Sequence, residues 1–449
     1  MTPAQMKRVD RALSGYLDYL TDGMGRPERR RALAWYLTGL LLEGERKTVV
    51  SMAGRLVDDE REVEAMRQRL QECVTFSTWA DAEVRRRVAR KVDEEVNPEV
   101  FVVDDTGFPK KGEHSVGVAR QYSGTLGRTD NCQVATSLHL ATNETSACIG
   151  MRLYLPEQWA SDVRRRRAAG VPENVVFQRK WEIAIELLDE ALSWELAARL
   201  VLADAGYGDC TEFRDALVAR ECRYLVGISG EHMTWPPGSH PRLPRRTQGP
   251  GRPPTQYRDG NRKPRTISEI AKSLDYRSYR CADGKGGTKT GQFAFARVQL
   301  AERRTKGRPP SEELWLICEY RPGNDEYKFY VSNLPANTSR YELVRLVKLR
   351  WRVERDYQEL KGEIGLDHFE GRTWRGFHHH ATLCAAAHAF LALQRRVFPP
   401  AHIPLDAADG TAPDPAPAAQ ANRYLPAVSS QIRGGHADSR AFADLIRSY

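Results

Sequence analysis

Three acidic residues occupy positions that a metal-assisted chemistry of phosphate esters would require. Asp105 follows a short β-branched and aromatic run at residues 100–103, and Asp204 follows the apolar run Leu200–Ala203. Both runs predict short strands, and ligand sites in α/β sheets are built where strands end. Glu354 lies in a strongly charged stretch that predicts a long helix.

Three carboxylates brought together by two strands and a helix would form the hard-oxygen site that Mg²⁺ or Mn²⁺ prefers. Two such ions bound close together can stabilise the attacking and leaving oxygens of an in-line phosphoryl transfer. The competing interpretation is that each acid is a turn or cap residue, since Asp is common in turns. Asp104, which adjoins Asp105, illustrates this ambiguity. The residues alone leave both interpretations open.

The elements that must position these acids follow from the hydrophobic pattern. The 449 residues are 41% hydrophobic and 28% charged, which is ordinary for a globular chain of two or three domains. Residues 1–95 predict a helical region, because apolar residues recur at helical spacing. From residue 96 to residue 230, strands alternate with helices and predict the first part of an α/β core. The expected strands lie at residues 100–103, 132–140, 200–203 and 223–228, and the expected helices at 176–196 and 213–219.

The second half of the chain predicts an insertion into this core. Residues 231–335 are basic and rich in Pro and Gly, with strand patterns at residues 293–300, 314–320 and 328–332. Residues 336–398 predict the final part of the core, with helices at 338–361 and 381–398, and Ser339 is suited to cap the first of them. Residues 399–449 form a tail whose first half is rich in Pro, Ala and Asp, which predicts a linker or a disordered segment.

The net charge of +9 and the pI of about 9.1 favour a polyanionic partner, although a generically basic protein has the same balance. Between Arg242 and Arg265 the chain has eight basic residues and one acid, Asp259. This stretch predicts an extended arm that binds the DNA backbone, with an inert solvated loop as the alternative. The residues expected to contact DNA there are Arg245, Arg246 and Arg252.

Three further patterns have a structural and a functional interpretation. The four arginines at residues 164–167 suit either phosphate contacts or a surface loop, and Trp235 and Trp315 suit either base stacking or the core. Three adjacent histidines, at residues 378–380, cannot all face one metal ion on a helix, so we expect no metal site there.

The chain has features expected of a cytoplasmic protein without membrane association. Its eight cysteines lack the spacing of zinc ligands or of a disulfide framework, as expected for free thiols in a reducing compartment. Residues 1–11 lack the apolar segment of a signal peptide. The longest apolar run, residues 381–393, is too short to span a bilayer and predicts a buried helix.

Three segments resemble the acid motifs of DDE-type insertion-sequence transposases. Residues 103–112 (VDDTGFPKKG) and 202–208 (LADAGYG) resemble the first two motifs. Residues 350–372 resemble the third, which in one large branch is Tyr-x2-Arg-x3-Glu-x6-Lys. Arg350, Glu354 and Lys361 fit that spacing, whereas Val347 stands in place of the tyrosine. The resemblance extends over about residues 25–395.

This resemblance implies an RNase H-like core, a mixed five-stranded sheet flanked by helices. It implies two-metal cleavage at the ends of an insertion sequence, followed by joining to target DNA through the freed 3′-hydroxyl. By motif position, Asp105, Asp204 and Glu354 become the catalytic ligands of two Mg²⁺ or Mn²⁺ ions, and Arg350 and Lys361 become contacts to DNA phosphates.

The resemblance also implies how the protein assembles and where it acts. We expect double-stranded DNA as the partner, both transposon ends and target, and a homodimer on paired ends. The helical N-terminal region would help to bind the transposon end, and the protein would lie with the nucleoid in a bacterial cytoplasm. Two alternatives remain open: a domesticated nuclease that no longer transposes, and a DNA-binding protein without catalysis.

Overall fold

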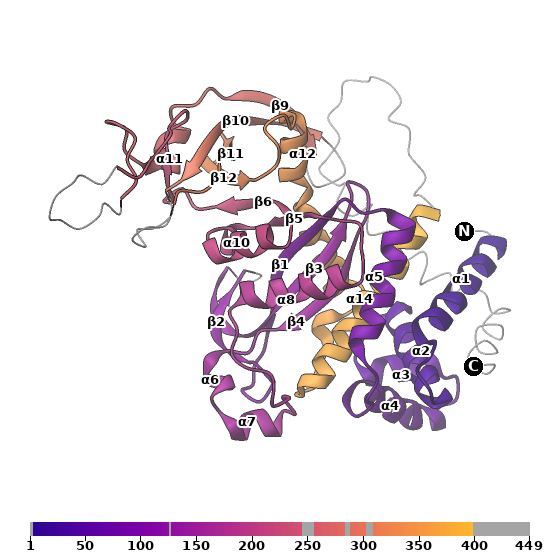
Figure 1. Ribbon diagram of the computed structural model, residues 1–449. Helices are drawn as coiled ribbons and strands as arrows, with labels where there is room; N and C mark the ends of the chain where they lie inside the picture. Colours follow the sequence, from indigo (N-terminus) through magenta and orange to yellow (C-terminus); the bar gives the residue numbers. More distant parts are fainter. Residues whose placement is uncertain (1–2, 125–126, 245–255, 283–287, 302–308, 398–449) are drawn as a thin grey trace. The chain divides into compact units, whose positions relative to one another are not determined.

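The computed structural model describes residues 3–124, 127–244, 256–282, 288–301 and 309–397, which form two compact units (Figure 1). Unit 1 contains the described residues of the ranges Met1–Pro98, Asp105–Ala197 and Arg352–Tyr449. Unit 2 contains Glu99–Asp104 and Ala198–Trp351. The predicted tail, residues 399–449, lies outside the described residues.

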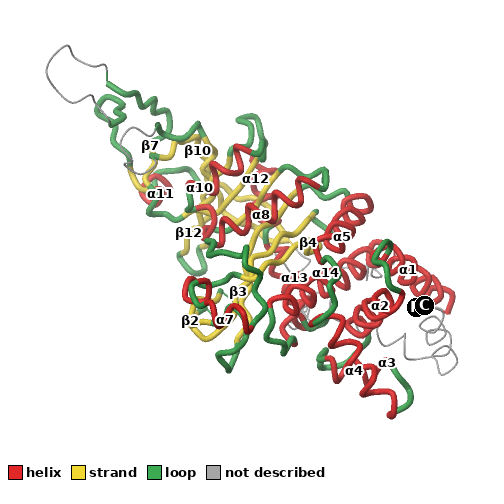
Figure 2. The backbone as a smooth tube through the Cα atoms, turned by 60° about the horizontal axis from the view of Figure 1, so that its bottom comes forward, coloured by secondary structure: helices red, strands yellow, loops and turns green. Residues whose placement is uncertain are grey.

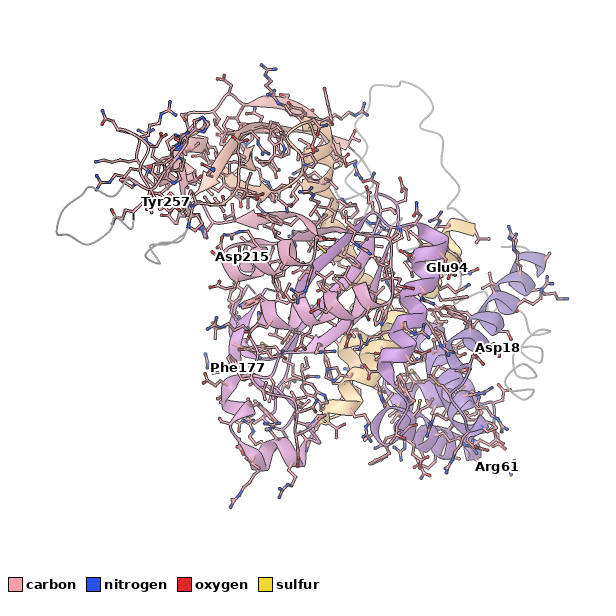
Figure 3. The ribbon with its side chains drawn as sticks, viewed as in Figure 1. Asp18, Arg61, Glu94, Phe177, Asp215 and Tyr257 are labelled. Carbon is pink, nitrogen blue, oxygen red and sulfur yellow. The ribbon has the colours of Figure 1, made fainter. Side chains whose placement is uncertain are left out.

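Unit 1 begins with five helices, and a helix from the end of the described chain packs against this group. The first five are α1 (Pro3–Thr21), α2 (Pro27–Leu41), α3 (Val49–Leu56), α4 (Glu60–Thr75) and α5 (Asp81–Val96). Helix α14 (Trp374–Val397) contacts α2, α4 and α5 (Figure 1, Figure 2). Its many alanines let neighbouring backbones approach closely, and all its residues from 376 to 393 are buried. Charged side chains such as Asp18 and Arg61 lie on the outer surface of the bundle (Figure 3).

The strands of unit 1 lie beside this bundle. Strand β3 (Arg128–Ala141) pairs antiparallel with β2 (Ala119–Ser123) and with β4 (Ser146–Leu153). Helix α14 contacts β4, and α5 contacts both β3 and β4. The remaining helices are α6 (Glu157–Ala160), α7 (Val163–Ala168), α8 (Lys180–Ser193), which contacts β3 and β4, and α13 (Trp351–Gly362), followed by the 3₁₀ turn η1 (Leu366–His368).

Unit 2 is built on a mixed sheet. The first residues of β1 (Val100–Pro109) pair parallel with β5 (Leu200–Ala203), which pairs parallel with β6 (Arg223–Ile228). Strand β6 pairs antiparallel with β12 (Glu326–Ser332), so the strands of the predicted insertion continue the sheet. The order then runs through β11 (Leu314–Arg321), β10 (Thr288–Leu300), β7 (Met233–Trp235) and β8 (Arg265–Thr266), with β9 (Arg277–Ala282) also paired to β10. The helices are α9 (Ala205–Gly208), α10 (Thr211–Ala219), α11 (Ile267–Ala271) and α12 (Arg340–Leu349).

The predicted fold class is confirmed: the protein is a mixed α/β protein with a large mixed sheet flanked by helices, consistent with an RNase H-like fold. The sheet is larger than the expected five strands, because the antiparallel strands of residues 231–335 extend it. Within the described ranges, no helix has the length and apolar character needed to cross a membrane.

Two of the predicted elements that carry motif residues differ from the structure. Asp105 lies inside β1, not after it, because the polar residues Asp104 to Thr106 continue the strand to Pro109. The predicted helix at 338–361 is two helices, which meet at Arg350, whose side chain reaches Asp104 of β1. Ser339 caps the first of these as expected, by accepting a hydrogen bond from the Glu342 amide at 3.1 Å.

The close packing of α9 on β6 gives a testable prediction for stability. A Cβ added to Gly208 would fall on the carbonyl oxygen of Gly227 and within 2.9 Å of Val226 Cγ2. Because backbone cannot yield like a flexible side chain, we expect Gly208→Ala to lower the free energy of unfolding by about 1–3 kcal/mol in a urea titration. Gly15, on helix α1 with open space around it, is the matched control. Gly15→Ala should leave stability unchanged or slightly higher, and equal stability of the two variants would contradict the packing argument.

Candidate functional site

The two adjacent acids of β1 have different surroundings, since successive side chains of a strand point to opposite faces. The Asp104 side chain is 12% exposed, and its carboxylate accepts a hydrogen bond from Arg350 Nη1 at 2.8 Å. The Asp105 side chain is 23% exposed and forms an ion pair with Lys180 Nζ, from the first residue of α8. Asp105 is therefore the more accessible acid of the first motif.

Asp204 directly follows β5 and caps α9, where its carboxylate accepts a hydrogen bond from the Tyr207 amide at 3.4 Å. The next acid, Asp209, fixes the far end of this short helix. Its carboxylate accepts from the Ser229 amide at 2.6 Å and lies 3.2 Å from His232 Nε2. Burial would raise the pKa of Asp209, but these two partners lower it below its usual value. The loop that carries Asp204 is thereby tied to the end of β6.

Glu354 lies in the first turn of α13 and is exposed. Two other acids of this helix, Asp356 and Glu359, are buried. Of these three, Glu354 is the one that a ligand can reach from solvent.

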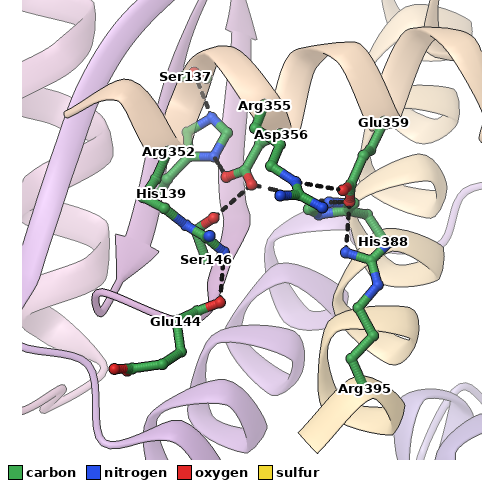
Figure 4. A network of polar contacts seen from close by, with 10 residues as sticks. All are labelled: Ser137, His139, Glu144, Ser146, Arg352, Arg355, Asp356, Glu359, His388 and Arg395. Carbon is green, nitrogen blue, oxygen red and sulfur yellow. Dashed lines mark hydrogen bonds and ion pairs between the residues drawn. The ribbon is translucent and has the colours of Figure 1, made fainter. Parts of the chain in front are cut away.

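Asp356 anchors α13 to the strands of unit 1 through a buried polar network (Figure 4). Its carboxylate lies 2.7 Å from His139 Nδ1 and accepts a hydrogen bond from Ser146 Oγ at 2.5 Å. His139 Nε2 lies 2.9 Å from Ser137 Oγ, which is 2.6 Å from the Tyr357 hydroxyl. The network therefore joins two consecutive residues of α13 to β3 and β4.

This network changes the charge state of its buried histidine. Burial alone would lower the pKa of His139, but Cys148 and Asp356 raise it to about 10. Burial would likewise raise the pKa of Asp356, and the hydrogen bond and charge of His139 lower it. Asp356 therefore stabilises the protonated form of His139.

A second set of contacts joins α13 to α14 (Figure 4). The Glu359 carboxylate lies 3.1 Å from His388 Nε2 and accepts hydrogen bonds from Arg395 Nη1 at 2.8 Å and from Arg355 Nε at 3.1 Å. Burial opposes ionisation of Glu359, but these partners hold its pKa well below its usual value. The helix that carries Glu354 is therefore held from two sides.

The two cations of the third motif both lie against β1. Arg350 pairs with Asp104, and Lys361 Nζ donates to the Gly107 carbonyl at 2.8 Å. Lys361 Nζ also lies 5.2 Å from the centre of the Phe108 ring, and burial lowers its pKa. Val347, at the position of the motif tyrosine, is buried in α12.

The structure also places other residues that the sequence singled out for a possible function. Trp235 is 4% exposed and Trp315 is 9% exposed, so both belong to the core. Each of His378, His379 and His380 is buried with its own partner, and burial lowers each pKa to about 4. The four arginines at residues 164–167 all lie on the short helix α7. The predicted DNA contacts Arg245, Arg246 and Arg252 lie outside the described residues.

The donor chemistry of the motif acids suits a divalent metal. All three are carboxylates, and none of them is fully buried. Asp105 and Glu354 belong to unit 1, and Asp204 belongs to unit 2. Within the residues that the structure describes, no group of three or more His, Cys, Asp or Glu side chains is arranged to hold a metal ion.

The mixed α/β fold, with its large mixed sheet flanked by helices, is consistent with the RNase H-like class. Residues 19–291 match the family model described as DDE superfamily endonuclease, and the chain belongs to this family. The matched residues include Asp105 and Asp204 and end before Glu354.

A curated relative supports the same assignment. The chain is 29% identical over 205 residues to a probable transposase for insertion sequence element IS701 from Microchaete diplosiphon. The alignment covers 45% of this chain and 49% of the relative, so the chain spans about half the length of the curated relative that it matches.

Sequence reasoning missed the residues that support the motif acids. Lys180 is 75 positions from Asp105, and His139 is 217 positions from Asp356. No local pattern marks such pairs, since each residue alone resembles an ordinary strand or helix residue. Asp209 could have been identified, because a second acid five residues after Asp204 can hold the other end of a short turn.

The buried pair of His139 and Asp356 gives a prediction for stability. Asp356→Asn keeps the shape of the side chain but leaves the imidazolium without its counter-ion, so we expect a loss of about 3–5 kcal/mol in the free energy of unfolding. Urea titration followed by circular dichroism measures this loss. Glu64→Gln, which removes an exposed ion pair with Arg67 on α4, should change stability little. A small loss for Asp356→Asn as well would show that the buried pair does not hold α13.

Proposed function

We propose that the protein is a transposase that cuts DNA at the ends of an insertion sequence and joins those ends to target DNA. One observation carries the proposal: none of the three motif acids is buried, whereas at the first and third motifs a neighbouring acid is buried in a structural contact. Asp104 is paired with Arg350, and Asp356 with His139. We therefore propose Asp105, Asp204 and Glu354 as the acids for chemistry.

In this proposal the three acids would hold two Mg²⁺ or Mn²⁺ ions, which would supply charge stabilisation for an in-line displacement at phosphorus. Water attacks the phosphodiester at the transposon end, the P–O3′ bond breaks, and a 3′-hydroxyl and a 5′-phosphate remain. That 3′-hydroxyl then attacks a target phosphodiester, whose own P–O3′ bond breaks as the new bond forms.

The protein's own residues position these reactants. The contact of Asp356 fixes the position of α13 on the strands of unit 1, and the contact of Glu359 fixes it against α14. Both contacts thereby position Glu354. Arg350 and Lys361 lie beside β1, the strand that carries Asp105, and are the proposed phosphate contacts. A cation next to the carboxylates would hold the scissile strand while the reacting atoms align.

The wider assembly also belongs to this proposal. Arg245, Arg246 and Arg252 would contact duplex DNA outside the catalytic acids, and the cutting of two ends together calls for a homodimer on paired ends. We expect the protein to act on the nucleoid of a bacterial cytoplasm. A domesticated nuclease would cut without joining, and a non-catalytic DNA-binding protein would do neither.

The proposal predicts the outcome of a cleavage experiment on the ends of the element. We expect the wild-type protein with Mg²⁺ or Mn²⁺ to cut at these ends, and Asp105→Ala, Asp204→Ala and Glu354→Ala each to lower the rate by at least about 10³-fold, or about 4 kcal/mol of barrier. Labelled DNA ends on a denaturing gel give the rate, and anisotropy shows whether each variant still binds DNA.

A control variant tests whether the loss of cleavage is specific to the three motif acids. Glu363 lies further along the same segment, and Glu363→Ala should retain cleavage. A wild-type protein that binds ends but never cuts with either metal would favour the non-catalytic alternative. Cutting without joining to target would favour the domesticated nuclease.

A second prediction concerns the ion pair of Lys180 with Asp105. A divalent ion at Asp105 must compete with the ammonium group, so we expect Lys180→Gln to bind Mn²⁺ about three- to tenfold more tightly, on the order of 1 kcal/mol for a part-exposed pair. Titration of the free Mn²⁺ signal by electron paramagnetic resonance measures this affinity without DNA. Lys91→Gln removes a comparable lysine paired with Glu95 and should leave the affinity unchanged. Equal Mn²⁺ affinity of all three proteins would refute competition by Lys180.

A further inference from the structure

The loop between α7 and α8 of unit 1 presents an exposed aromatic side chain. Phe177 lies near the end of this loop, at the surface of unit 1 (Figure 3), and is 38% exposed. Val176, directly before it, is 60% exposed. Adjacent exposed apolar residues are a candidate contact surface when the structure holds them in place.

The guanidinium group of Arg166 holds this loop in place. Its Nη2 donates to the carbonyl oxygens of Pro172 at 2.9 Å, of Glu173 at 3.2 Å and of Val175 at 2.7 Å. Its Nη1 donates to the carbonyl of Ala160 at 3.2 Å. Because the guanidinium is planar and its donors have fixed directions, the loop cannot shift without loss of several of these bonds. The exposed residues at its end are therefore held in one position.

A second aromatic ring supports Phe177 from within unit 1. The ring of Tyr154, which directly follows β4, lies 6.3 Å from the ring of Phe177 between centres, with an angle of 69° between the planes. This edge-to-face arrangement is a favourable one for two aromatic rings. The amide of Tyr154 donates to the carbonyl of Val134 on β3 at 2.9 Å, so the supporting ring is attached to the sheet. Since Phe177 remains partly exposed, a further flat group can stack on it.

The two rings lie close to the ion pair of Lys180 with Asp105. Phe177 is three residues before Lys180 in the chain, and Arg179 between them is exposed. Burial raises the pKa of the Tyr154 hydroxyl, and the charge of Lys180 opposes this rise, so the lysine is near both Tyr154 and Asp105. An aromatic ring beside cations suits a nucleic-acid strand, because the ring can stack on a base while the cations bind phosphates.

We propose that Phe177, supported by Tyr154, stacks on an unpaired base of the DNA strand that is cut at Asp105. Every base has a flat π-face, so this contact does not require a particular base. A base held on a rigid loop fixes the strand, and this aligns the neighbouring phosphodiester with Asp105. The inference rests on the proposed function for the presence of DNA. It assigns the base contact to a residue outside the acid motifs, whereas Trp235 and Trp315, which the sequence singled out for stacking, belong to the core.

The test uses duplexes of the element end in which one nucleotide at a time, on both sides of the cut, is replaced by an abasic site. Fluorescence anisotropy compares the full-length wild-type protein with Phe177→Leu, which keeps an apolar side chain but lacks the ring. On the intact end we expect the variant to bind about ten- to a hundredfold more weakly. At one abasic position the two proteins should bind equally, and this position identifies the stacked base and its strand. Phe177→Tyr should bind as the wild type does.

Phe76, an exposed phenylalanine at the end of α4, provides the matched control. Phe76→Leu should respond to each abasic site as the wild type does. The inference is overturned if Phe177→Leu loses the same factor on every DNA, as a purely structural role requires, or loses nothing on any. Light scattering without DNA tests the rival occupant, a second copy of the chain: a changed stoichiometry of Phe177→Leu would assign this surface to self-association instead. A wild-type protein that binds no element end would defeat the proposed function, and the inference with it.

Discussion

The buried contact between Asp356 and His139 fixes where α13 lies on the strands of unit 1. Both groups are removed from water, which costs free energy that the contact must offset. The offset comes from contacts to both oxygens of the carboxylate: one faces the His139 ring and the other accepts from Ser146. A buried charge pair with these bonds tolerates only one position of the helix, because sliding α13 by one residue would break all of them. The orientation of Glu354, two residues earlier, follows from this constraint.

A related arrangement recurs at the first and third acid motifs. Each of these segments contains two acids close together, and one of them is committed to a structural partner. A carboxylate that binds metal must be able to change partners. At the first and third motifs a neighbouring acid makes the structural contact, whereas Asp204 itself also caps α9. Division of these two tasks between neighbouring residues keeps the strand or helix rigid while the catalytic candidate remains accessible. The ambiguity between Asp104 and Asp105 in the sequence is an instance of this division.

The parts of the fold that sequence predicted best are those in which one local pattern dominates. Strands β5 and β6 are short apolar runs, and their predicted bounds match the structure. Strand β1 extends further than predicted, because Asp104, Asp105 and Thr106 have the composition of a turn although they continue the ladder. Helix α14 begins seven residues before the expected start at Ala381, since its first turns contain three histidines whose burial no hydrophobic pattern reveals. The candidate acids were found by spacing and resemblance, whereas their partners depend on tertiary contacts between distant residues.

The ion pair between Lys180 and Asp105 has a consequence for the protein before it meets its substrate. The ammonium group of Lys180, from α8, offsets the charge of the Asp105 carboxylate. Binding of a metal ion at Asp105, as proposed, would therefore be an exchange of one cation for another rather than a simple addition. Metal binding at Asp105 would then depend on which other anions bind Lys180. In the proposed reaction, a DNA phosphate is a strong competitor for this lysine. The binding of DNA would thereby favour metal binding at Asp105, and the protein would not cleave until its DNA substrate is bound.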